Sequence, residues 1–158
     1  MVTMIKYVVG FAFNESKTGV IMIHKEHPSW QKGKLNGVGG KADQQVEETQ
    51  RTRAHIETPY EAMVREFEEE TGVRFETWEC YAICEDKKKD ITMYCYRIFD
   101  NYISECKTMT DEVIKVCSPP AVITLGPPST LSNIPFLLAM AMDKNIIGAQ
   151  ITVSLDHP

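Results

Sequence analysis

The stretch REFEEETGV, residues 65–73, carries four glutamates and has a glycine near its end. In a helix each residue is turned by about 100° from the one before, so Glu66, Glu69 and Glu70 fall within one arc of about 100°. Three carboxylates on one patch repel each other unless cations lie among them, and Mg²⁺ accepts such oxygen ligands while also binding phosphates. Arg65 stands four residues before Glu69 and can orient that carboxylate. The pattern favours a divalent-cation site on a helix, and the alternative is an ordinary solvated acidic face.

The flanking residues have the punctuation of helix ends. Thr58 suits the N-cap, Pro59 the first turn and Gly72 the C-terminal stop of a helix over residues 60–71. Ala62 lies between the acidic positions, where its small side chain leaves room for a ligand. The apolar residues on a different face are Tyr60, Met63, Val64 and Phe67. This second face is expected to pack on a sheet.

The sheet is predicted from runs of apolar and β-branched residues on both sides of the helix. These runs cover residues 3–13, 20–25, 74–84, 91–100 and 112–117, and the tail at 146–155 can add one more. A second helix is expected from a Ser132 cap to about Lys144, with Pro135 in its first turn. Residues 26–41 read as a loop that passes into a glycine-rich segment. The polar stretch 42–56 has no convincing period and is interpreted as a solvated insertion, flexible or weakly helical.

The bulk composition indicates one globular domain over residues 1–158. The net charge of −5 argues against a surface that holds nucleic acid, although divalent cations could bridge an acidic protein to a small anionic substrate. The sequence contains no apolar run of the roughly 18 residues that a membrane span needs. The N-terminal apolar run reads as a strand better than as a signal peptide. Five cysteines without a Cys-x-x-Cys pair favour reduced thiols in the cytoplasm.

Two further features strengthen the interpretation of the acidic helix as a site. Glu57 precedes Arg65 by eight positions, and Gly39-Gly40-Lys41 lies upstream at the end of the loop. Glycines let backbone carbonyls approach a metal or phosphate closely, and Lys41 can add positive charge. Neither feature alone indicates a binding site, but the two together with the acidic helix do.

Together these residues resemble the Nudix box, G-x₅-E-x₇-R-E-U-x-E-E-x-G-U, in which U is aliphatic or apolar. The pattern is filled from Glu57 through Arg65 to Val73. The departure is at the front, where the glycine expected six positions before Glu57 is Arg51. Gly40 lies 17 positions before Glu57, so 11 extra residues lie inside the box, within the insertion at 42–56.

The resemblance implies an α/β/α sandwich with a mixed sheet and a Mg²⁺-dependent hydrolase, with Mn²⁺ as a substitute. Glu69 and Glu70 would be the principal metal ligands, Glu66 a ligand directly or through water, and the Gly39 carbonyl would also face a metal. Cations of this kind neutralise phosphate oxygens and activate a water for in-line attack on phosphorus.

The resemblance also implies roles for the residues around these ligands. Arg65 would orient the carboxylates, and Glu57 would support the junction between loop and helix. Glu66 is the first candidate for the general base. Glu112 is the second candidate, and its alternative is a turn carboxylate in solvent.

The expected substrate is a small nucleotide. Lys25 and Lys41 are candidate phosphate contacts, and Lys25 could equally be a plain surface lysine. Asn36 resembles the base-reading asparagine of oxidised-purine triphosphatases, although Asn-Gly is also an ordinary turn. Tyr7, Phe11 or Trp30 could stack on a base or pack in the core.

A MutT-like nucleoside polyphosphate pyrophosphohydrolase is the first hypothesis for the activity. The alternatives are a hydrolase of ADP-ribose, of a dinucleoside polyphosphate or of a nucleotide sugar, and a non-catalytic nucleotide-binding module. The protein is expected to act as a monomer or homodimer, without nucleic-acid or membrane partners.

Overall fold

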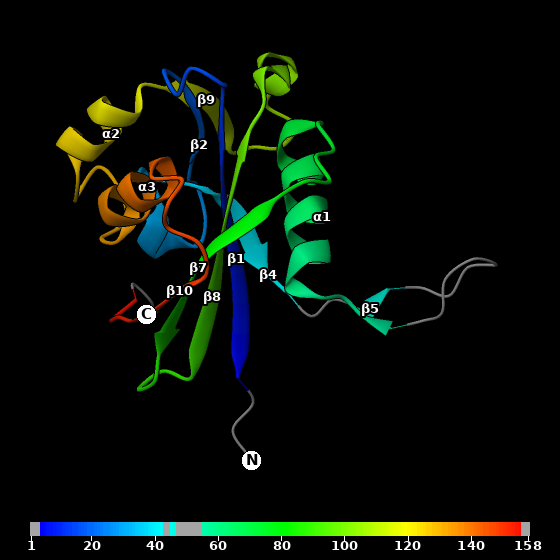
Figure 1. The fold of residues 1–158 in the computed structure, drawn as a ribbon, viewed down its shortest axis with the longest axis vertical. Coiled ribbons are helices and arrows are strands. Elements are labelled where there is room, and N and C mark those ends of the chain that lie inside the picture. Colours follow the sequence, from blue (N-terminus) through cyan, green and yellow to red (C-terminus); the bar gives the residue numbers. More distant parts are fainter. Residues whose placement is uncertain (1–3, 43–44, 47–54, 156–158) are drawn as a thin grey trace.

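One mixed sheet forms the centre of the molecule (Figure 1). The computed structural model describes residues 4–42, 45–46 and 55–155. Eight strands of these residues make up the sheet: β1 (Ile5–Phe13), β2 (Val20–His24), β3 (Leu35–Asn36), β4 (Val38–Lys41), β7 (Glu79–Asp86), β8 (Ile91–Phe99), β9 (Val113–Cys117) and β10 (Ala149–Thr152). The order is β10-β7-β8-β1-β2-β3, while β4 pairs with β1 and β9 with β2. The pairs β1–β8 and β7–β10 are parallel and the other pairs are antiparallel.

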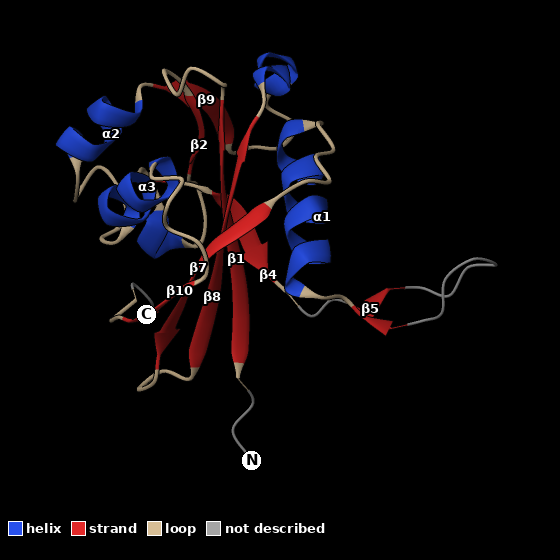
Figure 2. Ribbon diagram, viewed as in Figure 1, coloured by secondary structure: helices blue, strands red, loops and turns tan. Residues whose placement is uncertain are grey.

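Helices cover both faces of this sheet (Figure 2). Helix α1 (Pro59–Thr71) lies on one side, and α2 (Pro119–Leu125) and α3 (Ile134–Met142) lie on the other. Because side chains alternate along a strand, Val8 and Ala12 of β1 join the core under α1, whereas Val9, Phe11 and Phe13 join the core under α3. The expected α/β/α sandwich is confirmed. Within the described ranges, no helix is long and apolar enough to cross a membrane.

The ends of α1 are those that the sequence predicts. Thr58 accepts a hydrogen bond from the backbone N–H of Glu61, and the Glu61 side chain accepts one from the Thr58 backbone, which makes a capping box. Gly72 ends the helix with a φ of 78°, the left-handed conformation that favours glycine. Met63, Val64 and Phe67 are buried as an apolar face. Ala62, expected to leave room for a ligand between the acidic positions, is fully buried in the same core. Tyr60 was expected on that face, but it lies at the edge, 37% exposed, with its ring against Tyr96.

A buried arginine ties α3 to the sheet. Arg97 of β8 is 1% exposed, and its two terminal nitrogens donate to four backbone carbonyls at and beyond the end of α3. These carbonyls belong to Ala141, Asp143, Lys144 and Ile146, at distances of 2.7–3.4 Å. Its Nε donates to Glu79 at 2.8 Å. One side chain therefore satisfies carbonyls that a helix terminus leaves without partners.

Several predicted elements differ from those of the structure. The strand expected from residue 74 begins at Glu79, because Val73, Phe75 and Trp78 instead fill the core beside α1. Helix α2 was not predicted; it begins with Pro119 and Pro120, which are tolerated in the first turn of a helix. The second predicted helix has Asn133 at its N-cap position in place of Ser132. The glycine-rich segment, read as loop, contains the strands β3 and β4.

The ends of the insertion at 42–56 pair as two short strands. β5 (Gln45–Val46) and β6 (His55–Ile56) are antiparallel and form a separate sheet. This pair lies beyond the start of α1, away from the main sheet (Figure 1). Its described ends are extended and not helical, which corrects the expectation of weak helix there. Residues 43–44 and 47–54 of the insertion lie outside the described residues.

Candidate functional site

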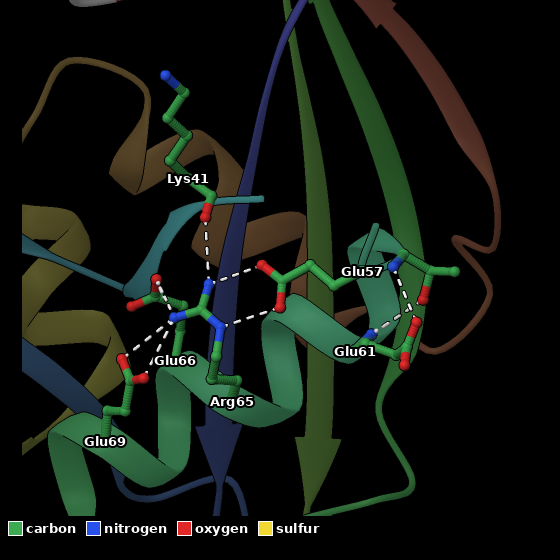
Figure 3. Close-up of polar contacts among 7 residues, drawn as sticks. Lys41, Glu57, Glu61, Arg65, Glu66 and Glu69 are labelled. Atoms are coloured by element: carbon green, nitrogen blue, oxygen red, sulfur yellow. Dashed lines mark hydrogen bonds and ion pairs between the residues drawn. The ribbon is translucent and has the colours of Figure 1, made fainter. Parts of the chain in front are cut away.

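Arg65 lies at the centre of the polar contacts around the acidic helix (Figure 3). Its Nε and Nη2 donate to the two carboxylate oxygens of Glu57 at 2.9 and 2.8 Å, a bidentate pair, and Nη2 also reaches the Lys41 carbonyl at 3.3 Å. Glu57 is only 4% exposed. These carboxylate contacts hold the pKa of Arg65 above its usual range. Arg65 therefore fixes α1 to the segment that precedes it and to the end of β4.

The remaining Arg65 nitrogen faces the helix carboxylates. Nη1 donates to Glu66 Oε1 at 2.9 Å and lies 3.2 Å from Glu69 Oε2 (Figure 3). Burial raises the pKa of Glu66 to about 7; Arg65 opposes this shift, and the charges of Glu69 and Glu70 add to it. Glu66 is thus a carboxylate that is costly to ionise where it lies, unless positive charge is added nearby.

Two glycines of β4 allow a very close approach of chain segments. A Cβ at Gly39 would lie 1.9 Å from the Val8 carbonyl oxygen of β1. A Cβ at Gly40 would lie 2.6 Å from Glu66 Oε1. Real Cβ contacts are longer than this, so any side chain here would displace β4 from β1 or Glu66 from β4. The glycine segment and the acidic helix, predicted separately, lie in direct contact.

Glu70 and Glu112 belong to a second polar cluster beside the first. Thr110 donates to Glu70 at 2.9 Å, and burial raises the pKa of Glu70. Glu112 is 2% exposed; it accepts from Lys25 Nζ at 2.9 Å and from the backbone N–H groups of residues 26 and 27 at 2.7 and 3.3 Å. Burial pushes the pKa of Glu112 up, but these donors outweigh it and leave the pKa lowered. Glu112 is therefore a fixed anion that holds Lys25.

A cavity of about 230 Å³ opens on the α3 side of the sheet, next to β4. Lys25, Asn36, Gly39 and Gly40 line it. The cavity therefore reaches the backbone of β4 against which Glu66 packs.

The aromatic candidates and Lys41 fall into different environments. Tyr7 and Trp30 also line the cavity, whereas Phe11 is fully buried in the core. The exposed side chain of Lys41 extends away from the carboxylates, and this residue contributes its backbone carbonyl instead (Figure 3).

The donor set suits a hard divalent cation, although its side chains are turned elsewhere. In the described part of the chain, no three His, Cys, Asp or Glu side chains gather closely enough to hold a metal ion. Glu66 and Glu69 face Arg65, and Glu70 faces Thr110. Burial, and to a smaller extent repulsion between carboxylates, raises the pKa of Glu66 and Glu70, and a cation would offset both effects. The residues therefore fit such an ion by chemistry and by proximity on one helix, after rotation of side chains.

Sequence reasoning missed Thr110 and the Lys25–Glu112 pair. Thr110 lies 40 positions from Glu70, and Lys25 lies 87 positions from Glu112. No spacing rule links residues that far apart. The pairing of β2 with β9 brings Lys25 to Glu112, and the segment that carries Thr110 is joined to the end of α1 by the hydrogen bond from the Lys107 N–H to the Thr71 carbonyl.

The sequence and the fold of this chain resemble those of known proteins. The family model described as NUDIX domain matches residues 4–132. Comparison with curated proteins found no match. Among the solved structures that share the fold are the following three, all at low sequence identity.

The NUDIX domain of Shewanella oneidensis NrtR, complexed with ADP ribose, has a TM-score of 0.64 and 16% identity, covering 89% of this chain and 88% of that chain. The MutT protein of Bacillus halodurans has a TM-score of 0.62 and 14% identity, covering 97% and 94%. The MutT protein of Methanosarcina mazei Go1 has a TM-score of 0.60 and 19% identity, covering 92% and 99%. At these identities the structural likeness establishes the fold alone.

Proposed function

Because the chain belongs to the Nudix family, with residues 4–132 matching the domain model, we infer that it is a metal-dependent hydrolase of nucleoside diphosphate derivatives. The favoured substrate is a nucleoside triphosphate, cut at a diphosphate linkage as in MutT-like action. The observation that carries this inference is the contact of Glu66 with Gly40, which joins the acidic helix to the rim of the cavity. A base in the cavity would leave its phosphates beside the carboxylates.

Glu66, Glu69 and Glu70 would hold the divalent ion, with the Gly39 carbonyl as a further ligand. A bound Mg²⁺, or Mn²⁺ in its place, supplies charge that neutralises phosphate oxygens and makes a water more nucleophilic. Oxygen-rich sites of this type are those that Nudix enzymes generally provide for divalent metals.

The residues of the chain have distinct tasks in this proposal. Arg65 holds Glu66 through Oε1, and we assign the proton of the attacking water to Glu66 Oε2. Without a cation, burial raises the pKa of Glu66 to about 7. A bound cation would lower this pKa, so that Oε2 is ionised and can accept the proton. Both oxygens of Glu112 are engaged, so we assign it to positioning Lys25, which would bind a phosphate oxygen. Asn36 would contact the base.

ADP-ribose is the second candidate substrate. The NrtR domain, among the structures most similar to this chain, is complexed with ADP ribose. A cavity for a single base does not separate the two substrates, because both have a base joined to a diphosphate.

A screen of nucleoside di- and triphosphates, ADP-ribose and dinucleoside polyphosphates, each with Mg²⁺ or Mn²⁺, tests the proposal. We expect hydrolysis that disappears with EDTA, and the products identify the bond that is cut. Glu70→Gln should lower kcat by roughly 100-fold or more, because a metal ligand loses its charge.

The matched control is Glu68→Gln on the same helix, whose carboxylate is exposed and pairs with Arg74. It should leave kcat near the parent value. Tight nucleotide binding with no turnover of any substrate would identify a binding module and reject the enzyme.

We propose a cytoplasmic setting, because all five cysteines are free thiols, as is usual in a reducing compartment. A small nucleotide is the expected partner.

A further inference from the structure

Gln31 combines a position at the cavity wall with a buried polar atom. The residue lines the cavity, and its side-chain oxygen Oε1, which is shielded from solvent, has no hydrogen-bond partner in the described residues. Rotation of the side chain would bring this oxygen to a ligand in the cavity. A buried acceptor without a donor lowers the stability of a protein, so such atoms are rare and call for an explanation. The comparable atom Trp78 Nε1 lies instead in the apolar core beside Phe67 and Phe75, away from the cavity.

The turn that carries Gln31 is held in place by its backbone. The Gln31 N–H donates to the Pro28 carbonyl at 2.9 Å, and the Gln31 carbonyl accepts from Lys34 at 3.0 Å. The neighbouring Gly33 N–H donates to the Lys25 carbonyl at 2.8 Å, which fastens the turn to the end of β2. The Gln31 side chain thus projects from a fixed position beside the cavity, and a ligand need not order the loop to meet it.

The surroundings of Gln31 suit a flat ring with polar edges. Tyr7 and Trp30 supply aromatic walls, Leu137 supplies an aliphatic one, and Asn36 adds a second carboxamide. At about 230 Å³ the cavity is smaller than the roughly 300–1,000 Å³ of pockets that bury whole drug-sized ligands. It therefore accepts a base and leaves the rest of a nucleotide outside.

We propose that Gln31 is a specificity-determining residue, whose Oε1 accepts a hydrogen bond from the exocyclic amino group of a purine. This assignment rests on the proposed function for the identity of the ligand as a nucleotide. The site selects purines that carry such a donor over purines that lack it, because a base without the donor leaves the buried oxygen unpaired.

Pairs of substrates that differ by one donor test the assignment. ATP is compared with purine riboside triphosphate, which lacks the amino group, and GTP with inosine triphosphate, which lacks the 2-amino group. For at least one pair, kcat/KM of the parent protein should fall by roughly 10- to 100-fold when the donor is absent. Equal kcat/KM within both pairs would overturn the assignment while leaving the hydrolase function intact.

Variants separate recognition from a structural role. The donor ratio is kcat/KM for the substrate with the amino group divided by kcat/KM for the substrate without it. Gln31→Met removes the acceptor at similar length and should bring this ratio close to one, with a melting temperature equal to or above that of the parent. Gln31→Glu keeps an acceptor at Oε1 and should preserve the ratio. Gln150→Met, on exposed β10, is the control and should change nothing. If Gln31→Met slows every substrate equally and keeps the ratio, Gln31 is merely structural and the proposal fails.

Equilibrium binding distinguishes failure of this proposal from failure of the proposed function. The four parent nucleosides, which carry no phosphate for the carboxylates to repel, are titrated by calorimetry in EDTA, where no turnover is expected. A donor-dependent difference in Kd without hydrolysis of the triphosphates under Mg²⁺ would retain Gln31 and reject the hydrolase. No binding of any of the four would overturn the assignment of the cavity to purines.

Discussion

Two arginines, one on each face of the sheet, are paired with very different partners. Arg97, under α3, donates to four backbone carbonyls and is almost fully buried. Arg65, on α1, is bound by carboxylates of Glu57, Glu66 and Glu69 and keeps 22% of its side chain exposed. Backbone carbonyls cannot leave without unfolding the chain around them, whereas a carboxylate side chain can rotate toward another cation. The first arrangement fixes structure, and the second can be rearranged by a ligand.

The largest effect is expected from Arg97→Met. Its loss leaves the buried or part-buried carbonyls of Ala141, Lys144 and Ile146 without this donor, whereas the Asp143 carbonyl keeps the Ile146 N–H. Each unsatisfied group costs about 1–3 kcal/mol, so the free energy of unfolding should fall by about 3 kcal/mol or more. Denaturant titration measures this. Arg97→Lys should recover only part of the loss, because an ammonium group lacks the planar fork of donors. A fall below about 1 kcal/mol would mean that these three carbonyls do not depend on Arg97, and the contrast with Arg65 would disappear.

Arg65→Lys should instead act mainly on turnover. A lysine cannot bind Glu57 through two nitrogens while it also orients Glu66 and Glu69, so kcat/KM should fall by roughly 10- to 100-fold, as for residues that orient metal ligands. Stability should fall by about 1 kcal/mol, since the buried Glu57 keeps a positive partner. Arg74→Lys is the control, because Arg74 also contacts two glutamates but is exposed. A stability loss as large as that of Arg97→Met would contradict the distinction.

A smaller effect should appear in the pH dependence of stability. The pKa of Glu66 is about 7 in the folded protein against an ordinary 4.5, so the folded state binds the proton more tightly. Its contribution is therefore most favourable at low pH and is lost as pH rises from about 4.5 to 7. In EDTA, the free energy of unfolding of Glu66→Gln should decline less than that of the parent over this window. Parallel curves for the two proteins would show that Glu66 ionises without penalty.

The sequence predicted local features well. Thr58, Pro59 and Gly72 delimited α1 because caps and stops act within a few residues. The 100° turn per residue put Glu66, Glu69 and Glu70 on one arc of this helix, but their side chains turn to Arg65 and Thr110 and do not gather. The contact of Arg65 with Glu69 followed from a spacing of four. The Nudix box, filled from Glu57 onward, indicated the family despite the insertion, because this part of the pattern lies within one helix and its flanks.

Features that depend on distant segments could not be predicted in this way. Arg97 reads in the sequence as a charged residue within a strand, and its partners lie 44–49 positions away. Gly39 was read as part of a loop, but the absence of its side chain is what lets β4 pair with β1. The cavity that contains Gln31 is assembled from β1, β3, α3 and the turn before β3, and no single stretch encodes it.

The backbone at Gly39 and Gly40 has one more consequence. Because no side chain intervenes, the distance from the cavity to the Glu66 carboxylate is set by the thickness of a bare strand. A nucleotide anchored by its base would then present a fixed length of phosphate chain to the acidic helix. The phosphorus attacked would be the one that lies at this distance from the base. Substitutions that alter base preference should therefore leave the cleaved bond unchanged.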